Sequence, residues 1–298
     1  MSTLKRRLAL PLGLLALIGL LSLIERLPGG PPAHSAEWLQ ADDVSLRTVR
    51  LGRGDTTLVM LHGYGESLMA WRAIADRLGQ RFRVVAVDLP GFGVSDKPPG
   101  PYTLDAMHRR LATFVARWTD GPVIVVGHSM GGEIAASLAM SEPRVVAAVL
   151  VAPAGYELAA LIDSLPPSVA GLAGAATPLV LPVHDPQWLR EPDHRADYDP
   201  VLDSAYRNAT RTVLEQFDFA ALRHRFRTLA KPVLLLWGRQ DPTIPFEIGE
   251  AVAAELPCAT FVPIEGALHR PHQAQPDRVA AEIEEFLART RECLASKP

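Results

Sequence analysis

The chain has 298 residues, of which 48% are hydrophobic and 21% are charged. This composition supports one large domain with a sizeable core, and the charged content is ordinary for a soluble domain. A net charge of −3, with no basic stripe beyond the N-terminus, argues against a nucleic-acid partner. Two cysteines, Cys258 and Cys293, can make neither a zinc site alone nor a disulfide framework, so they are buried thiols or one bridge.

An almost wholly apolar segment precedes the body of the chain. Leu8 to Ile24 carries no charge and follows Lys5-Arg6-Arg7, which predicts a cytoplasmic N-terminus. Its length lies between a signal-peptide core and a membrane-spanning helix. We therefore expect residues 1–26 to be an uncleaved membrane anchor, with the body on the periplasmic or extracellular side. A cleaved signal ending at Ala33-His34-Ser35, which gives a secreted protein, and a lid-like amphipathic helix are the alternatives. Residues 27–43 are predicted to be a linker, because the segment is rich in proline and glycine.

Strands and helices alternate along the body of the chain from about residue 44 to residue 290. The strands are continuous apolar runs, as a parallel sheet covered by helices on both faces requires. Predicted strands are Val44–Leu51, Thr57–Leu61, Phe82–Val87, Val123–Val126, Val145–Val151, Val233–Trp237 and Thr260–Ile264. Predicted helices are Ser67–Leu78, Leu104–Trp118, Glu133–Met140, Phe246–Leu256 and Asp277–Leu287. The sequence therefore predicts a mostly parallel, twisted α/β sheet flanked by helices, with its core at residues 44–153 and 231–298.

The alternation breaks between Pro153 and Lys231, where the sequence has many prolines and no strong strand signal. The interval is too long for a plain loop inside a compact domain. Its apolar pieces, such as Leu179-Val180-Leu181, argue against disorder. We expect residues 154–230 to form a helical cap inserted over the ends of the strands.

A G-x-S-x-G motif, Gly127-His128-Ser129-Met130-Gly131, joins the predicted strand Val123–Val126 to the helix after it. A strand that ends in this motif and turns at once into a helix is typical of a nucleophile elbow, where small residues let the turn tighten and expose the serine hydroxyl. The alternative is a glycine-rich turn with an idle serine. Because the secondary structure fits on both sides, we expect Ser129 to be a nucleophile.

A serine nucleophile needs a base within hydrogen-bond reach, and the base needs a third group to orient it. Asp241 and His269 each follow a predicted strand, so both are expected at the carboxyl edge of the sheet. The chain order Ser129, Asp241, His269 is the order known for an elbow of this kind. His272 competes with His269 as the base, and Asp241 next to Pro242 could merely shape a turn.

Attack on a carbonyl also needs N–H donors for the developing oxyanion. The backbone N–H groups of Met130 and of Tyr64 are the candidates, the second in the turn His62-Gly63-Tyr64-Gly65. His62, Gly63, Tyr64 and His128 are predicted to lie at the substrate, although the His62 ring fits a structural role better than a catalytic one, and the Tyr64 ring either lines the pocket or packs. The other histidines, His108, His184, His194 and His224, lack metal-ligand spacing, so neither a metal nor a cofactor is expected.

Taken together, these motifs and the segment Asp88–Asp96 resemble the α/β-hydrolase superfamily, over about residues 44–290. The resemblance implies the α/β-hydrolase fold, a Ser129-Asp241-His269 triad and a helical cap. An aspartate at the elbow marks epoxide hydrolases and haloalkane dehalogenases, and Ser129 does not fit them. The run from His128 to Gly132 is more similar to esterases and acylglycerol lipases. One departure is Ala274, where the family usually has a glutamate.

The expected function is therefore a serine hydrolase that cleaves carboxylic esters of small molecules or lipids, with a hydrophobic acyl chain favoured by the apolar cap. Two alternatives remain open. One keeps the triad but performs carbon–carbon hydrolysis, lyase chemistry or perhydrolysis, for which Arg190, Arg207 and Arg211 are candidate cap groups. The other is a ligand-binding protein of the same fold that has lost turnover. No protein partner is indicated by the sequence.

Overall fold

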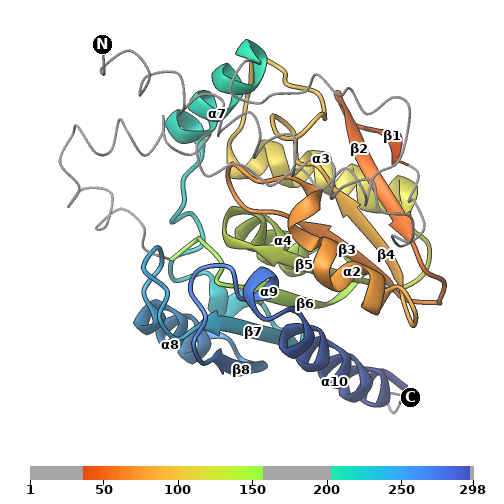
Figure 1. Cartoon of the computed structure of the whole chain (residues 1–298), viewed down its shortest axis with the longest axis vertical. Coiled ribbons are helices and arrows are strands. Elements are labelled where there is room, and N and C mark those ends of the chain that lie inside the picture. The colour runs from red at the N-terminus through yellow and green to blue at the C-terminus, as the bar shows by residue number, and fades with distance from the viewer. Residues whose placement is uncertain (1–35, 157–202, 296–298) are drawn as a thin grey trace, which may run out of the picture.

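The computed structural model of the chain describes residues 36–156 and 203–295. Its centre is an eight-stranded sheet with the strand order β1-β2-β4-β3-β5-β6-β7-β8 (Figure 1). The strands are β1 Ala36–Ala41, β2 Val44–Leu51, β3 Thr57–Leu61, β4 Arg83–Val87, β5 Val123–His128, β6 Val145–Val151, β7 Val233–Gly238 and β8 Ala259–Ile264. Strands β3 to β8 are parallel to one another. At one edge β1 and β2 form an antiparallel hairpin, and β2 pairs antiparallel with β4. The carboxyl ends of the six parallel strands therefore share one edge of the sheet, where α/β proteins place their sites.

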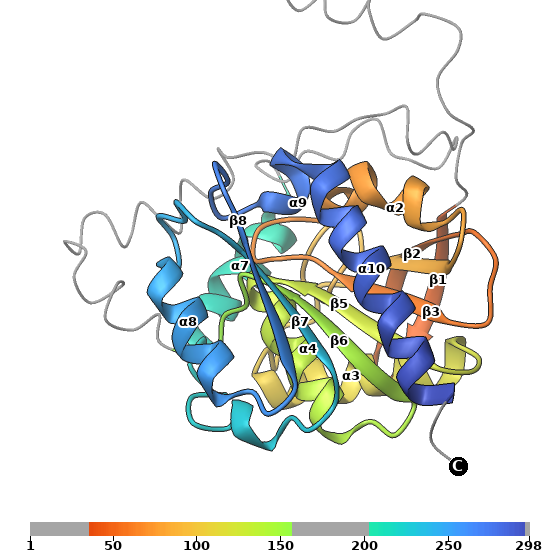
Figure 2. The ribbon, with the colours of Figure 1, turned by 90° about the horizontal axis from the view of Figure 1, so that it is seen from below.

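Helices cover both faces of the sheet, as Figure 2 shows. On one face α2 Arg72–Leu78 and α10 Pro276–Ala295 share a core with Leu58 and Met60 of β3. On the other face α3 Leu104–Trp118, α4 Ser129–Ser141 and α8 Phe246–Glu255 share a core with Val59 and Leu61. Successive residues of β3 thus belong to opposite cores, which explains the unbroken apolar sequence of the strand. Shorter described elements are the 3₁₀ helices η1 Leu68–Trp71 and η2 Phe226–Thr228, the helix α7 Ser204–Gln216 and the helix α9 Pro271–Ala274.

The predicted fold class is confirmed, but the sheet begins earlier than the sequence analysis placed it. Strand β1 lies in the predicted linker at residues 27–43 and pairs with β2 across the turn Asp42-Asp43. Only Leu39 and Ala41 of this strand are buried, so its sequence lacks the apolar pattern that reveals a strand. The predicted cap, residues 154–230, falls largely outside the described residues, and its described end carries α7 and η2.

The prediction of a membrane anchor must be corrected. Across residues 36–156 and 203–295, no helix combines the length and the apolar character that crossing a bilayer requires. The longest described helix, α10, has 20 residues but carries charged side chains throughout. Leu8 to Ile24, on which the anchor prediction rested, lies outside the described residues. The predicted periplasmic or extracellular location, and the membrane as a partner, depended on that anchor and fall with it.

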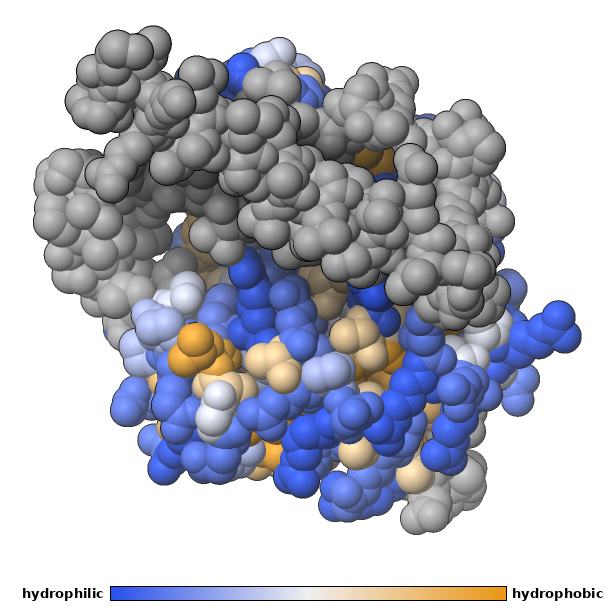
Figure 3. Space-filling model, viewed as in Figure 1, coloured by the Kyte–Doolittle hydropathy of each residue, from blue (hydrophilic) through white to orange (hydrophobic). Residues whose placement is uncertain are grey.

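The described surface is mostly hydrophilic in the view of Figure 3, with separate apolar patches. Trp38, Leu214 and Leu268 are the large apolar side chains that are exposed among the described residues. Cys258, in the turn between α8 and β8, is an exposed free thiol, so the prediction of a buried thiol is wrong for this residue. The side chain of Cys293 lies outside the description.

Candidate active site

Ser129 occupies a strained backbone position between β5 and α4. Its φ angle is +51°, in the left-handed region that non-glycine residues rarely adopt. The turn is tight: a Cβ atom on Gly127 would lie 2.2 Å from the carbonyl oxygen of Gly131, and a Cβ on Gly131 would lie 2.3 Å from that of Leu61. Both glycines are therefore required for the start of α4 to pack against the ends of β5 and β3. This is the geometry predicted for a nucleophile elbow.

Asp241 is held in the turn after β7 with its two carboxylate oxygens committed to different partners. Oδ1 accepts hydrogen bonds from the backbone N–H groups of Thr243 at 2.8 Å and Ile244 at 3.0 Å. Oδ2 lies 2.7 Å from Nδ1 of His269. The Asp241 side chain is fully buried, and that of His269 is only 15% exposed. Because the carboxylate accepts at Nδ1, it leaves Nε2 of a neutral His269 ring free to take a proton.

The loop after β8 crosses the end of β7 before it presents His269. A Cβ atom on Gly238, the last residue of β7, would lie 2.0 Å from the carbonyl oxygen of Leu268, so the crossing needs glycine there. The crossing brings the His269 ring to 4.8 Å, centroid to centroid, from the ring of His128, the residue before Ser129. The predicted base, which follows β8, thus reaches the elbow at the end of β5 from three strands away in the sheet.

Burial lowers the pKa of His269, and the nearby His128 lowers it further, whereas the hydrogen bond to Asp241 raises it. The net lowering favours the neutral ring that a general base requires. Within the described residues, no hydrogen bond closes the last step from His269 to Oγ of Ser129. In ligand-free enzymes such bonds often form only when substrate binds, so the full triad stays a prediction.

The two predicted oxyanion donors come from neighbouring strands. β3 pairs with β5 in a register that places Leu61 opposite Gly127, so the turn after β3 lies beside the elbow. Met130 is in the first turn of α4, where backbone N–H groups have no partner within the helix. Tyr64 is three residues past Leu61, as Met130 is three past Gly127. The register is what an oxyanion hole built from these two amides needs, and their role stays a prediction.

The ring of Tyr64 packs rather than pointing its hydroxyl into open solvent. The hydroxyl donates to the carbonyl oxygen of Thr210 on α7 at 3.1 Å. The ring makes edge-to-face contacts with Phe92 and Phe219, at centroid distances of 5.7 and 6.3 Å. Burial raises the pKa of this phenol, which therefore stays neutral. Three aromatic side chains therefore pack together next to the turn that carries the candidate oxyanion donor.

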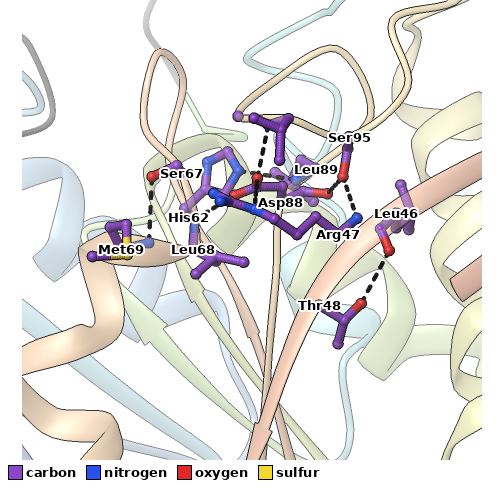
Figure 4. Close-up of polar contacts among 12 residues, drawn as sticks. Leu46, Arg47, Thr48, His62, Ser67, Leu68, Met69, Asp88, Leu89 and Ser95 are labelled. Atoms are coloured by element: carbon purple, nitrogen blue, oxygen red, sulfur yellow. Dashed lines mark hydrogen bonds and ion pairs between the residues drawn. The ribbon is translucent and has the colours of Figure 1, made fainter. Parts of the chain in front are cut away.

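His62 is completely buried and uses both ring nitrogens for backbone contacts. The N–H of Leu89 donates to Nε2 at 2.9 Å, so Nδ1 carries the proton and donates to the carbonyl of Gly63 at 2.8 Å (Figure 4). Burial lowers the pKa of this histidine and keeps it neutral. Its imidazole therefore has no nitrogen left for a substrate and instead connects the turn after β3 to the segment after β4.

Asp88, at the start of that segment, is fully buried and holds three elements together. Its carboxylate accepts from Nε of Arg47 at 2.7 Å and from the N–H groups of Leu68, also at 2.7 Å, and Val94 at 2.9 Å (Figure 4). Burial raises the pKa of Asp88, but the Arg47 guanidinium and the hydrogen bonds outweigh it and hold the pKa below its usual value. These contacts stabilise the surroundings of the site, as expected of a segment without a catalytic role.

The predicted substrate contacts His128 and Gly63 are buried, and both contact a residue that the sequence analysis missed, Glu66. Oε2 of Glu66 is 3.0 Å from Nδ1 of His128 and accepts from the N–H of Gly63 at 2.8 Å. A Cβ atom on Gly63 would lie 2.8 Å from the same Nδ1, so glycine leaves room for the His128 ring. The available signal was the spacing of Glu66, three residues after Gly63, which resembles a capping interaction.

One group of described residues, Glu66, His128 and His272, brings candidate ligand atoms within 4.8 Å of one another. The group does not fit a metal ion. Glu66 and His128 are already bonded to each other, and Nε of Arg270 lies 2.6 Å from Oε1 of Glu66. A cation placed here would face a guanidinium at contact distance.

The remaining predicted residues lie elsewhere. Arg207 and Arg211, offered for the carbon–carbon alternative, are exposed on α7, and Arg190, His184 and His194 lie outside the described residues. Two further histidines make surface contacts: His108 bonds Oγ of Ser137, and His224 lies 3.3 Å from Glu255.

The chain is similar in sequence and fold to several known proteins. The chain is 27% identical over 270 residues to an uncharacterized protein of Mycobacterium tuberculosis, covering 82% of this chain and 79% of that one. It is 29% identical over 264 residues to a pimeloyl-[acyl-carrier protein] methyl ester esterase of Edwardsiella ictaluri, covering 79% and 94%. A crystal structure of a membrane phospholipase A superposes with a TM-score of 0.64 at 27% identity, covering 97% of both chains. The sequence model of the alpha/beta hydrolase family matches residues 58–282. The chain therefore belongs to the alpha/beta hydrolase family.

Proposed function

We propose that the protein is a carboxylester hydrolase that works through an acyl-enzyme on Ser129. The observation that carries the proposal is the hydrogen bond of 2.7 Å between Asp241 and His269. It lies at the same edge of the sheet as Ser129, whose backbone has a left-handed conformation. An esterase and a phospholipase among the relatives support the reaction class.

In the proposed reaction, His269 takes the proton of Ser129 as the hydroxyl attacks the ester carbonyl. The negative charge that develops on the carbonyl oxygen is stabilised by the N–H groups of Met130 and Tyr64. The tetrahedral intermediate then collapses, and the departing alcohol receives the proton from His269. A water molecule, deprotonated by His269, attacks the acyl-enzyme. As the bond between Ser129 and the acyl group breaks, His269 returns this proton to Ser129 and the carboxylic acid leaves. Asp241 keeps the imidazole in the required tautomer throughout.

The variant Ser129→Ala tests the nucleophile. We expect it to lose cleavage of p-nitrophenyl butyrate and labelling by a fluorophosphonate probe, while its thermal unfolding stays cooperative. Ser137→Ala is a matched control, because this serine is on the same helix and bonds His108. Retained turnover in Ser129→Ala would falsify the assignment. A wild-type serine that does not react with the probe would favour a binding protein instead.

We further propose an ester with an apolar acyl chain as the substrate. Support comes from the aromatic side chains beside the candidate oxyanion turn. The ring of Tyr64 contacts those of Phe92 and Phe219, and the ring of Phe92 also contacts that of Tyr206. A panel of p-nitrophenyl esters from acetate to palmitate tests this. We expect kcat/KM to rise with chain length from acetate, and a decrease from acetate onward would contradict the proposal.

A further inference from the structure

One buried pair of side chains, Glu66 and His128, joins three segments that carry candidate catalytic groups: the loop with His269, the turn with Tyr64 and the elbow with Ser129. Nε2 of His128 lies 2.9 Å from the carbonyl oxygen of His269. Nδ1 lies 3.0 Å from Oε2 of Glu66, which also accepts from the N–H of Gly63, next to Tyr64. His128 itself precedes Ser129. The pair is thus hydrogen-bonded to the loop that carries His269 and to the turn that carries Tyr64, and His128 is the neighbour of Ser129 in the chain.

The partners of His128 determine its protons. A backbone carbonyl can only accept a hydrogen bond, so Nε2 must donate to His269. Glu66 is held as a carboxylate by groups other than His128: Nε of Arg270 lies 2.6 Å from Oε1, and the N–H of Gly63 donates to Oε2. Burial raises the pKa of Glu66, but its neighbours hold that pKa well below its usual range. A carboxylate only accepts hydrogen bonds, so Nδ1 of His128 must donate as well. An imidazole that donates from both nitrogens is a cation.

The other charged and titratable groups around His128 are consistent with a buried cation paired to Glu66. Nε of Arg270 is 2.6 Å from Oε1 of Glu66. The ring of His272 lies 4.6 Å from that of His128, and burial together with the neighbouring His128 lowers the pKa of His272 well below its usual value, so it is neutral. The ring of His269 is 4.8 Å away. The buried His62 faces the pair from the end of β3 and is neutral.

We propose that Glu66 and His128 form a buried ion pair that positions the catalytic base, with His128 doubly protonated and donating to the backbone carbonyl of His269. The proposal rests on the assignment of His269 as the base. A base held only by its ring can swing about the Cα–Cβ bond and with its loop. Asp241 fixes the ring at Nδ1, and His128 fixes the backbone of the same residue. Two anchors on one residue define where Nε2 lies relative to Ser129.

The protonation state is tested on the wild-type protein without any assay of activity. In protein labelled with ¹⁵N-histidine, we expect the ring of His128 to show two N–H signals at pH 7. Through-bond correlations to its ring protons and loss of the signals in His128→Gln assign them. A ring with one unprotonated nitrogen would overturn the proposal.

The positioning role is tested with Glu66→Gln, His128→Gln and the double variant, with rates normalised to the sites titrated by a fluorophosphonate. We expect kcat to fall about 10- to 100-fold in each single variant, with KM changed by less than about threefold, since misplacement of a catalytic group acts on the chemical step. The double variant should be no slower than the slower single variant, because it leaves no unpaired buried charge.

The pH profile separates positioning from a merely structural role. In His128→Gln a positive charge beside His269 is removed while Glu66 and Arg270 remain, so we expect the acid limb of kcat/KM to move to higher pH. A variant that is only less stable would keep the wild-type limb and the wild-type kcat per active site. Glu133→Gln is the matched control, because Glu133 is a buried acidic side chain on the same helix as Ser129 and makes no described hydrogen bond or ion pair with Glu66, His128 or His269.

The outcomes distinguish this inference from the proposed function. If wild-type enzyme cleaves esters but the Glu66 and His128 variants keep its kcat and acid limb, the ion pair has no positioning role. If wild-type protein neither cleaves esters nor reacts with the probe, the proposed function fails, and the histidine signals still decide whether the ion pair exists.

Discussion

At the scale of single residues, the carboxylate of Asp241 has a defined partner for each of its two oxygens. Its Oδ1 is held by the turn that follows it, and its Oδ2 is left for His269. In Asp241→Asn the side chain keeps its shape, but it no longer stabilises the cation that His269 becomes during the reaction, and it favours the wrong tautomer. We expect kcat to fall by about 10³- to 10⁴-fold, on the scale of the corresponding change in serine proteases.

The control for this prediction is Asp120→Asn. The Asp120 side chain is 96% exposed, and its ion pair with Arg83 is long, at 3.8 Å. This variant should retain the wild-type rate. Steady-state kinetics on p-nitrophenyl butyrate measure both variants. An Asp241→Asn enzyme within tenfold of wild type would mean that another group orients the base.

Glu133 is a buried residue with an unusual protonation state. Both carboxyl oxygens are buried, and neither has a hydrogen-bond partner of good geometry among the described residues, although the backbone of Ala221 is close enough to lower the pKa slightly. Burial, with a further contribution from Asp218, raises the pKa of Glu133 well above its usual value, so the side chain is a neutral acid in the folded protein. As the pH rises, the unfolded chain releases this proton near pH 4.5, and the folded chain releases it only at a higher pH. The folded state therefore loses stability as the pH rises between the two pKa values.

Glu133→Gln removes this pH dependence without changing the shape of the side chain. We expect the variant to gain stability relative to wild type as the pH rises from 5 to 8, at up to about 1.4 kcal/mol for each pH unit between the two pKa values. Urea unfolding at pH 5 and pH 8 measures the difference. The exposed Glu250→Gln on α8 should show equal differences at both pH values, and the same result for Glu133→Gln would contradict the prediction.

At the scale of elements, the site depends on how the hairpin β1–β2 is joined to the parallel sheet. Arg47 of β2 is almost fully buried and contacts Asp88 after β4 at 2.7 Å. Removing one partner of a buried ion pair leaves the other charge uncompensated, which costs about 3–5 kcal/mol. We expect Arg47→Met to lower the free energy of unfolding by an amount in this range, measured by urea denaturation.

Arg53→Met, at an exposed position after β2, should change stability by less than about 0.5 kcal/mol. Adding Asp88→Asn to Arg47→Met should recover part of the loss, because the uncompensated charge is then gone. An Arg47→Met protein as stable as its control would show that the pair contributes nothing to the junction.

The elements also show what sequence reasoning can reach. Apolar runs predict β3 to β8, and because parallel strands share a carboxyl edge, the order of Ser129, Asp241 and His269 predicts that their loops converge. The structure brings two of these residues, Asp241 and His269, to 2.7 Å from each other, and the triad as a whole stays a prediction. Strand β1 escapes prediction, since only Leu39 and Ala41 are buried in it.

The partnership of Glu66 with His128 also escapes prediction, for a different reason. It depends on the register of β3 against β5, and the link onward to His269 depends on the crossing of the β8 loop over Gly238. Neither is visible in the local sequence, where His128 looks like a residue that faces the substrate and Glu66 like a surface carboxylate. Buried polar networks of this kind are set by tertiary contacts between distant segments.

At the scale of the whole molecule, the sheet separates two cores. Ile134 of α4 is fully buried in the core shared by α3, α4 and α8, and Ile283 of α10 is fully buried in the core shared with α2. Removing one methyl group from either, as in Ile134→Val and Ile283→Val, should cost about 0.5–1.5 kcal/mol. Because the two side chains lie in different cores, the double variant should lose the sum of the two stability losses within about 0.5 kcal/mol, with a single cooperative transition in urea.

The comparison is a pair of variants within one core, Ile74→Val with Ile283→Val, for which we expect a larger departure from additivity. Strong coupling between Ile134 and Ile283, or two separate transitions, would mean that the sheet transmits packing changes between its faces or that the layers unfold independently. Additive costs in one transition would show instead that the two cores are packed independently but support the same strands, and hence the same strand ends that carry the site.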